Sequence, residues 1–245
     1  MAEASILQYV VYSLVIAVVI ATVVIVIDTF YPFLPINPLT GPSYAARASR
    51  TFWPQPTEQD GLTVAAADSP TVNGSSYTMS VQLVIADSRI SSPTTLQHIL
   101  HRGTAACPGS TPDIVMNPGV FLDAKTNDIH IFINTTGKED GITVPYKEHV
   151  AVRDMPLGTP ITLGIVNNGR TVEVYVNCRL YSTLLLKGTP VVTDNKWWGR
   201  YCPNSFSGIV KNLQLWGTPL GSADYMQLCT VGSVNTADLP QICAK

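Results

Sequence analysis

Charged side chains are scarce in this chain of 245 residues. Only 13% of the residues are Asp, Glu, Lys or Arg, and the formal net charge at pH 7 is -2. No long basic run occurs anywhere in the sequence. Because proteins bind phosphate backbones through clustered Lys and Arg, we expect no nucleic-acid partner.

The sequence also lacks the short motifs that identify common enzyme classes. It contains no Gly-x-Ser-x-Gly elbow, no phosphate-binding loop and no dinucleotide fingerprint. His98, His101 and Cys107 are residue types that bind zinc, but no fourth ligand is evident beside them. We therefore expect neither an enzyme nor a bound metal or cofactor.

Cysteine is sparse, and no pair of cysteines has the Cys-x-x-Cys spacing of a zinc ribbon or a thioredoxin motif. The count is odd, so at least one thiol has no intramolecular partner. The five cysteines are Cys107, Cys178, Cys202, Cys229 and Cys243.

Charge is absent altogether from the 22 residues Ile6 to Ile27. At about 1.5 Å per residue, a helix of this run is about 33 Å long, which is enough to cross a bilayer core of about 30 Å. A signal peptide is the alternative, but no Lys or Arg precedes the run, and the run is longer than a signal h-region. We predict a single-pass membrane anchor, a transmembrane α-helix over residues 1–28.

Two weaker signals concern the anchor and its orientation. Ser13, Ala17 and Ala21 form a stripe of small residues that lets membrane helices approach closely, although chance explains such a stripe equally well. The first basic residues after the run are Arg47 and Arg50, which slightly favours a cytosolic location for the rest of the chain. Glycosylation sequons begin at residues 73 and 134 and give weak support to the opposite side.

Residues 29–60 are rich in proline and aromatic residues, which predicts an extended, semi-rigid linker. Phe52 and Trp53 in this linker allow two interpretations. They pack on the folded domain, or they dock the linker on a neighbouring protein. Large aromatic side chains usually become buried, which favours the first interpretation.

Strand signals dominate residues 61–245. Polar and apolar residues alternate over Tyr77–Ile85, and Val172, Val174 and Val176 alternate with polar or aromatic neighbours after an Asn-Gly turn. Only Thr95–His101 has a helical pattern. Many short strands with regular turns predict an all-β sandwich or jelly roll.

Two segments resemble laminin-G-like domains of the concanavalin A-like superfamily. The segment 164–188, GIVNNGRTVEVYVNCRLYSTLLLKG, resembles their strand–turn–strand core, with Cys178 where Gly is usual. The segment 205–228, SFSGIVKNLQLWGTPLGSADYMQL, resembles their final strand. The resemblance implies a concanavalin A-like jelly roll over residues 61–232, followed by a C-terminal tail.

The functional residues of that superfamily are mostly missing. Its hydrolases carry paired carboxylates on one strand, whereas Glu139-Asp140 here lies in a turn and Glu148 stands alone. Asp123 and Asp128 flank a loop that is better interpreted as a solvated turn than as a calcium site. The superfamily often has a disulfide near its C-terminal end, which implies pairing among Cys202, Cys229 and Cys243, unless the domain is cytosolic and all five are reduced.

One aromatic cluster is a candidate binding surface. Trp197, Trp198, Arg200 and Tyr201 would stack on a sugar ring or contact a protein partner. The alternative is that one Trp belongs to the core and the other covers the end of the sandwich, as buried Trp residues usually do.

An anchor, a spacer and a jelly roll together resemble membrane-associated minor structural proteins of large icosahedral DNA viruses. This resemblance implies a non-enzymatic protein that ties a lipid bilayer to the proteins of a coat or capsid, at the interface between a virion's inner membrane and its capsid. The alternative function is that of a membrane-anchored, lectin-like protein that binds glycans or mediates adhesion.

Overall fold

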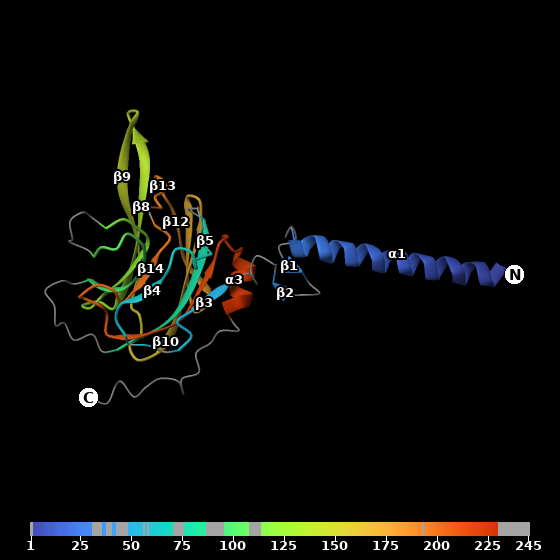
Figure 1. Ribbon diagram of the computed structural model, residues 1–245, viewed down its shortest axis with the longest axis horizontal. Helices are drawn as coiled ribbons and strands as arrows, with labels where there is room; N and C mark the ends of the chain where they lie inside the picture. Colours follow the sequence, from blue (N-terminus) through green and yellow to red (C-terminus); the bar gives the residue numbers. More distant parts are fainter. Residues whose placement is uncertain are drawn as a thin grey trace.

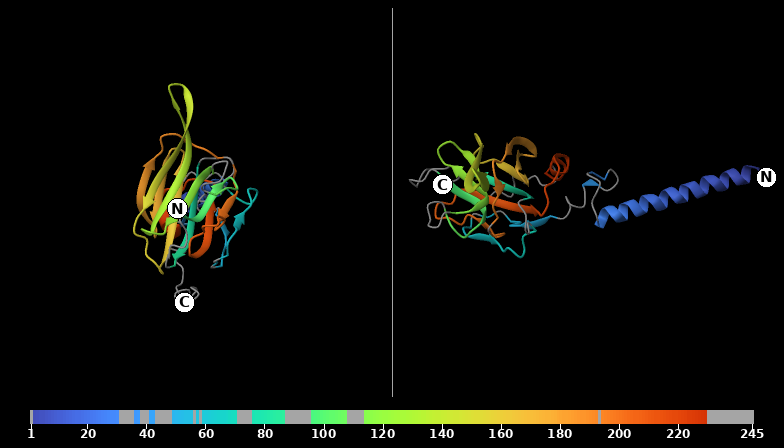
Figure 2. Two further views of the ribbon diagram at one scale, coloured as in Figure 1. Left: turned by 90° about the vertical axis from the view of Figure 1, so that its left-hand side faces the viewer. Right: turned by 90° about the horizontal axis from the view of Figure 1, so that it is seen from above.

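A computed structural model of the chain describes residues 2–30, 36–37, 41–42, 49–55, 57, 59–70, 76–86, 96–107, 114–192 and 194–229. It consists of one long helix that extends away from a β-sandwich (Figure 1). Helix α1 spans Ala2–Phe30, and the short strands β1 (Ile36–Asn37) and β2 (Gly41–Pro42) pair with each other beyond it. Figure 2 shows the same separation of α1 from the sandwich in a second view.

Helix α1 contains the whole uncharged run, and its side chains are described at residues 8–9 and 11–24. These side chains are exposed around the helix, except that Val24 is partly buried, and the large apolar ones among them range from Tyr9 at 73% to Val23 at 49%. Within the part of the chain that the structure describes, no helix is both long and apolar enough to cross a membrane.

One sheet of the sandwich has six strands, and each neighbouring pair is antiparallel. In spatial order they are β12 (Arg179–Leu185), β11 (Thr171–Val176), β10 (Pro160–Asn168), β5 (Tyr77–Ile85), β15 (Gly208–Trp216) and β3 (Arg50–Phe52).

The opposing sheet has seven strands. Six of them follow the order β13 (Thr189–Pro190), β8 (Asp128–Glu139), β7 (Met116–Asp123), β6 (Leu96–Gly103), β14 (Trp197–Gly199) and β4 (Leu62–Val64). The seventh, β9 (Ile142–Val152), pairs with β8 along its whole length. The β8–β9 hairpin projects beyond the body of the sandwich (Figure 1).

Period-two alternation places one face of each strand in the core between the sheets. Val172 and Val174 of β11 are fully buried there, and Val176 packs against the same core from a partly buried position. Glu173 and Tyr175 lie on the other face of the strand, where Tyr175 joins a second apolar cluster. The prediction of an all-β sandwich and the face assignment of β11 are both confirmed.

Helix α3 (Ser222–Cys229) covers the outer face of the six-stranded sheet. The Tyr225 ring lies 4.4 Å from that of Tyr175, and the Tyr225 hydroxyl is 3.2 Å from Ser80 Oγ. Gly164 lies beneath this ring, since a Cβ atom there would approach the Tyr225 hydroxyl to 1.8 Å. A residue without a side chain is therefore required for α3 to pack on the sheet.

The structure corrects two expectations about local structure. The segment Thr95–His101 was predicted to be helical, but its described part, Leu96–His101, belongs to strand β6, which pairs with β7 and β14. The sandwich also starts before residue 61, because β3 pairs with β15 and the Asn212 backbone N–H donates to the Trp53 carbonyl at 2.8 Å. The expected linker therefore ends near Arg50.

Candidate functional site

The two tryptophans of the expected aromatic platform are structural. Trp197 is fully buried in the core, and its Nε1–H donates to Ser69 Oγ at 3.1 Å. Trp198 is 7% exposed, and its Nε1–H donates to the Gly103 carbonyl at 2.9 Å. The Lys196 ammonium lies 3.9 Å from the centre of the Trp198 ring. Neither indole offers an open face to a sugar.

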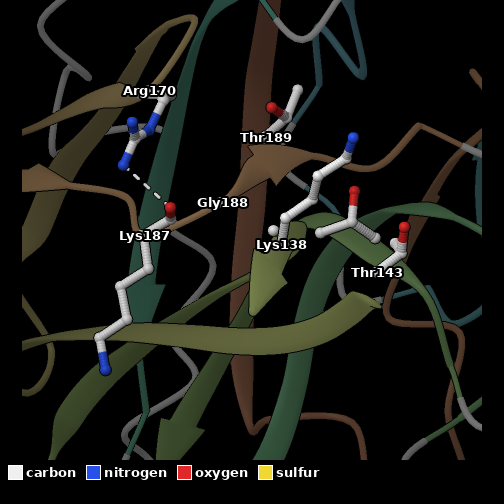
Figure 3. Close-up of a pocket in the computed structure, with 8 residues that line it drawn as sticks. Lys138, Thr143, Arg170, Lys187, Gly188 and Thr189 are labelled. Atoms are coloured by element: carbon white, nitrogen blue, oxygen red, sulfur yellow. Dashed lines mark hydrogen bonds between the residues drawn. The ribbon is translucent and has the colours of Figure 1, made fainter. Parts of the chain in front are cut away.

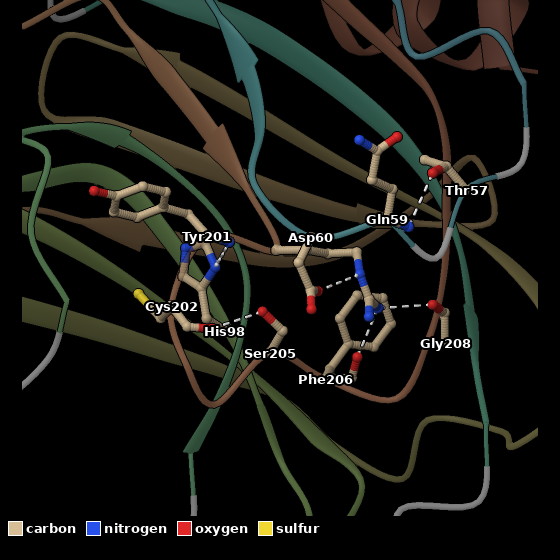
Figure 4. A network of polar contacts seen from close by, with 10 residues as sticks. Thr57, Gln59, Asp60, His98, Tyr201, Cys202, Ser205, Phe206 and Gly208 are labelled. Atoms are coloured by element: carbon tan, nitrogen blue, oxygen red, sulfur yellow. Dashed lines mark hydrogen bonds and ion pairs between the residues drawn. The ribbon is translucent and has the colours of Figure 1, made fainter.

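Arg200 is likewise used within the fold. Its Nη1 donates to the carbonyls of Phe206 and Gly208 at 2.7 and 2.8 Å, and its Nε lies 3.1 Å from the exposed carboxylate of Asp60 (Figure 4). The guanidinium also lies over the Phe206 ring. Among the four expected binding residues, only Tyr201 is substantially exposed, at 37%.

A buried pair of histidines lies beside this cluster. The Tyr201 backbone N–H donates to His98 Nδ1 at 3.2 Å (Figure 4), and His98 Nε2 lies 2.8 Å from His101 Nδ1. Because His98 accepts at Nδ1, its proton is on Nε2, and the proton of His101 is then on the Nε2 that faces the Thr104 carbonyl at 3.0 Å. Burial and then the neighbouring His101 lower the pKa of His98 to about 3. Burial also lowers the pKa of His101, against the opposing effect of its bond to Thr104.

Cys107, the third candidate zinc ligand, cannot bind a metal ion together with these histidines. Cys107 forms a disulfide with Cys202, with their Cα atoms 5.6 Å apart. In the described ranges no group of three His, Cys, Asp or Glu side chains is placed to hold a metal ion. Cys178 is also disulfide-bonded, whereas the Cys229 side chain and Cys243 fall outside the described residues.

The disulfide corrects the pairing expected among the C-terminal cysteines. Cys202 follows β14, and Cys107 follows β6 in the loop after Gly103. Since β14 pairs with β6, the two cysteines meet although they are 95 residues apart in sequence. The expected partner of Cys202 within the C-terminal trio was therefore wrong.

Phe52 and Trp53 pack on the domain rather than standing free in a linker. Both are partly buried against the core between the sheets. The Trp53 ring lies so close to Gly199 that a Cβ atom there would approach it to 2.6 Å. This is the first of the two interpretations of these residues, and it leaves little of either ring for docking on a neighbouring protein.

The stripe of small residues in α1 is exposed. Ser13, Ala17 and Ala21 lie on the helix without covering contacts among the described residues, and Ser13 Oγ donates to the Tyr9 carbonyl one turn earlier at 2.9 Å. The role of the stripe in helix packing stays a prediction.

The carboxylates considered for catalysis or calcium binding each have a local structural partner. Asp123 Oδ1 accepts from the Lys125 backbone N–H at 2.8 Å, and Asp128 Oδ1 accepts from the Asp154 backbone N–H at 2.9 Å. Glu139 accepts from the Tyr146 hydroxyl at 2.6 Å. These bonds stabilise turns and the β8–β9 hairpin.

The site that the sequence did not reveal is an open groove of about 430 Å³ at one edge of the sandwich. It lies between the β8–β9 hairpin, the turn from β10 to β11 and the loop from β12 to β13 (Figure 3). Its lining consists of three cationic residues, three threonines and two glycines: Lys138, Arg170, Lys187, Thr136, Thr143, Thr189, Gly137 and Gly188.

Glu148 does not line the groove, but its carboxylate stabilises the β12–β13 loop that forms one wall of it. Its carboxylate accepts from the backbone N–H groups of Lys187 and Gly188 at 2.8 and 3.1 Å and from Thr135 Oγ1 at 2.6 Å. Burial opposes ionisation of this carboxyl, but these hydrogen bonds outweigh it and lower the pKa of Glu148. The ionised carboxylate thus holds the β12–β13 loop against β8. No local motif predicts such a groove, because its cations are scattered singly through the sequence.

Comparison with known proteins identifies the fold but no family. No protein-family model matches the chain, and no curated protein matches it in sequence. The HCR/D F1240A mutant aligns with a TM-score of 0.52 and 10% identity over 75% of this chain and 42% of that one. The botulinum neurotoxin serotype G binding domain aligns with a TM-score of 0.48 and 13% identity over 74% of this chain and 42% of that one.

Trypanosoma rangeli sialidase, in complex with 2,3-difluorosialic acid, aligns with a TM-score of 0.43 and 15% identity over 63% of this chain and 22% of that one. The chain thus spans less than half the length of these proteins. The likeness to the HCR/D F1240A mutant, at 10% identity, shows a shared β-sandwich of the jelly-roll type, as the sequence predicts, and nothing about ligands.

Proposed function

We propose that the chain is a non-enzymatic binding module that α1 attaches to a membrane. The observation that carries this proposal is the apolar surface of α1, which is exposed all round the helix. A helix that is apolar on every side is covered by lipid or by the core of a larger assembly. The uncharged run Ile6–Ile27 extends beyond the part of α1 whose side chains are described, and its length suits a bilayer.

The disulfide supports a location of the sandwich on the oxidising side of that membrane. Disulfides persist in extracellular, lumenal and periplasmic spaces and are rare in the cytosol. The bond between Cys107 and Cys202 therefore favours the side opposite to the one suggested by Arg47 and Arg50. On that side the module would serve adhesion or carbohydrate binding at a surface.

A second role, tying the bilayer to the proteins of a coat or virion capsid, is supported by strand β12. Among the described residues β12 lies at the edge of its sheet and pairs only with β11. Leu180 and Leu185 on this edge are 50% and 70% exposed. Free strand edges with apolar side chains are surfaces on which another protein adds a strand.

Alkaline extraction of membranes tests the attachment. The full chain should stay in the membrane pellet, and the double variant V15K/V19K should leave it. Each Lys at the centre of a membrane helix costs about 2.5–3.5 kcal/mol. The matched double variant V15L/V19L keeps the apolar surface and should remain in the pellet. Extraction of the unaltered chain, or retention of the Lys variant, would show that lipid does not cover α1.

Protease treatment of sealed vesicles tests the side. Vesicles whose lumen corresponds to the oxidising compartment should protect the sandwich until detergent is added. Digestion without detergent would place the sandwich in the cytosol and contradict the inference from the disulfide.

Co-purification of the chain with a coat, lost in the L180S/L185S variant, would favour the second role over adhesion.

A further inference from the structure

The groove beside the turn end of the β8–β9 hairpin gathers positive charge in a chain that has little charge elsewhere. We infer that this groove binds an acidic saccharide, a polyhydroxylated ligand that carries a carboxylate or sulfate group. The inference rests on the proposed binding role, but it does not depend on membrane attachment.

The charge of the groove comes from three separate segments. Lys138 lies on β8, Arg170 follows β10, and Lys187 follows β12, and the lining contains no carboxylate. Among the described residues neither lysine ammonium lies within ion-pair distance of a carboxylate. Glu148 behind the β12–β13 loop offsets part of this charge, but its oxygens are committed to backbone N–H groups and to Thr135. The groove therefore keeps a net positive charge that attracts an oxyanion.

Arg170 is held in place before any ligand arrives. Its Nε and Nη2 donate to the Leu186 carbonyl at 3.0 and 2.7 Å, and Nη2 donates to the Lys187 carbonyl at 2.9 Å (Figure 3). The Leu186 backbone N–H donates in return to the Arg170 carbonyl at 2.7 Å. Nη1 makes no such bond in the described part of the chain and stays available to a ligand. A guanidinium fixed in this way loses little freedom when it binds a carboxylate or sulfate.

The remaining walls fit a hydroxyl-rich molecule. The hydroxyls of Thr136, Thr143 and Thr189 have no hydrogen-bond partner among the described groups, so all three can serve ligand hydroxyls. The volume of about 430 Å³ lies within the usual range for small-molecule sites. No aromatic or long aliphatic side chain lines the groove. A nucleobase or an acyl chain would find no stacking or apolar surface there.

Gly188 allows the loop to approach the hairpin, and Gly137 leaves room for the Tyr146 ring within the hairpin. A Cβ atom on Gly188 would lie 2.6 Å from the Thr136 carbonyl oxygen, and one on Gly137 would lie 2.7 Å from the Tyr146 ring. Backbone rather than side chain therefore forms this part of the groove. Together with the Glu148 bonds, the glycines keep the groove open and fixed in shape.

Titration calorimetry on the full chain in detergent tests the inference with four probes. Digalacturonate is the acidic saccharide, and its dimethyl ester is the same molecule without charge. Inorganic sulfate represents a free anion, and glycerophosphoserine represents a lipid headgroup. We expect saturable binding of digalacturonate, at least tenfold weaker binding of the ester, and weakening by added salt. Equal binding of ester and acid, or binding of sulfate or glycerophosphoserine as tight as that of digalacturonate, would overturn the inference.

Substitution of the two lysines locates the site. Both side chains are exposed and neither forms an ion pair among the described residues, so K138M and K187M should fold normally. Each should weaken digalacturonate binding up to about fivefold, and the double variant about tenfold or more. The matched variant K125M, in the turn between β7 and β8, should bind as the unaltered chain does. Unchanged affinity in the folded double variant would rule out the groove, while membrane pelleting of the same variant reports separately on attachment.

Discussion

His98 Nε2 and His101 Nδ1 lie 2.8 Å apart within a buried chain of hydrogen bonds that requires both rings to be neutral. One end of the chain is the Tyr201 backbone N–H, which donates into His98, and the other is the Thr104 carbonyl, which accepts from His101. Every ring nitrogen is therefore used. A proton added to His98 Nδ1 would oppose the Tyr201 N–H and break a bond that ties β6 to the segment after β14, and a proton added to His101 Nδ1 would oppose the proton on His98 Nε2.

This geometry predicts that the sandwich loses stability as the pH falls from 7 to 5. The pKa of His98 is about 3 in the folded chain and 6.5 in the unfolded chain, so in this range the unfolded state binds a proton that the native state excludes. The stability that the neutral His98 contributes is fully present above pH 6.5 and is lost progressively as the pH falls toward 3. The unfolding free energy should fall by up to about 1.4 kcal/mol per pH unit for each buried histidine. Urea unfolding at pH 7, 6 and 5 measures it.

A variant without the histidines is the control for this prediction. The double variant H98Q/H101Q should be less stable at pH 7 but should show a smaller change between pH 7 and 5. The partly exposed His149, whose pKa is lowered by burial and by His130, contributes in both proteins and cancels in the comparison. Equal slopes in the two proteins would mean that His98 and His101 are protonated without cost.

The same strand shows why part of the fold could not be predicted from the sequence. Strand β6 has register shifts between His98 and Leu100 and between His101 and Gly103. The first shift places both Ile99 and Leu100 in the core, so the apolar spacing imitates a helix. Strand β11 pairs with β10 in an unbroken register, and the shift in its pairing with β12 leaves out Tyr181 of β12 rather than a residue of β11, so its period-two pattern predicted it correctly.

The groove escaped prediction for a different reason. Lys138, Arg170 and Lys187 belong to three segments that meet only because β13 pairs with β8 while β12 lies in the opposite sheet. Sequence patterns report the faces of single strands, and not which loops become neighbours. The Trp197–Trp198 pair is the opposite case, because it is a conspicuous local cluster in the sequence and both indoles are buried in the structure.

Replacement of Gly164 by Ala tests how α3 packs on the sheet. A Cβ atom at this position would lie 1.8 Å from the Tyr225 hydroxyl and 2.2 Å from its Cζ atom. The ring must move away from Tyr175 and Ser80, which we expect to cost about 1–3 kcal/mol of unfolding free energy. Gly221→Ala is the control, because nothing lies within 4 Å of a Cβ atom there. Equal stability of the two variants in urea would show that Tyr225 does not occupy this position.

Replacement of Val174 by Asp tests the core assignment of β11. Val174 is fully buried between the sheets, so an aspartate there has no partner and should cost more than about 3 kcal/mol. Leu185→Asp is the matched control on the neighbouring strand, because Leu185 is 70% exposed. Its melting temperature should stay within a few degrees of that of the unaltered chain. A Val174→Asp protein with an unchanged melting temperature would reverse the face assignment.

The bond between Cys107 and Cys202 should contribute measurably to stability because it joins segments 95 residues apart in sequence. Closing so long a loop removes freedom from the unfolded chain and is expected to contribute about 2–4 kcal/mol. Cys107→Ser and Cys202→Ser each delete the same bond, so each should lower the unfolding free energy by the same amount.

The double variant should lower it no further, since the two effects are not additive within one bond. Chemical unfolding of the four proteins under non-reducing conditions measures this cycle. Peptide mapping without reductant should recover Cys107 linked to Cys202. Recovery of Cys202 joined to Cys178, or additive losses in the double variant, would contradict the pairing and, with it, the tie between the loop after β6 and the turn after β14.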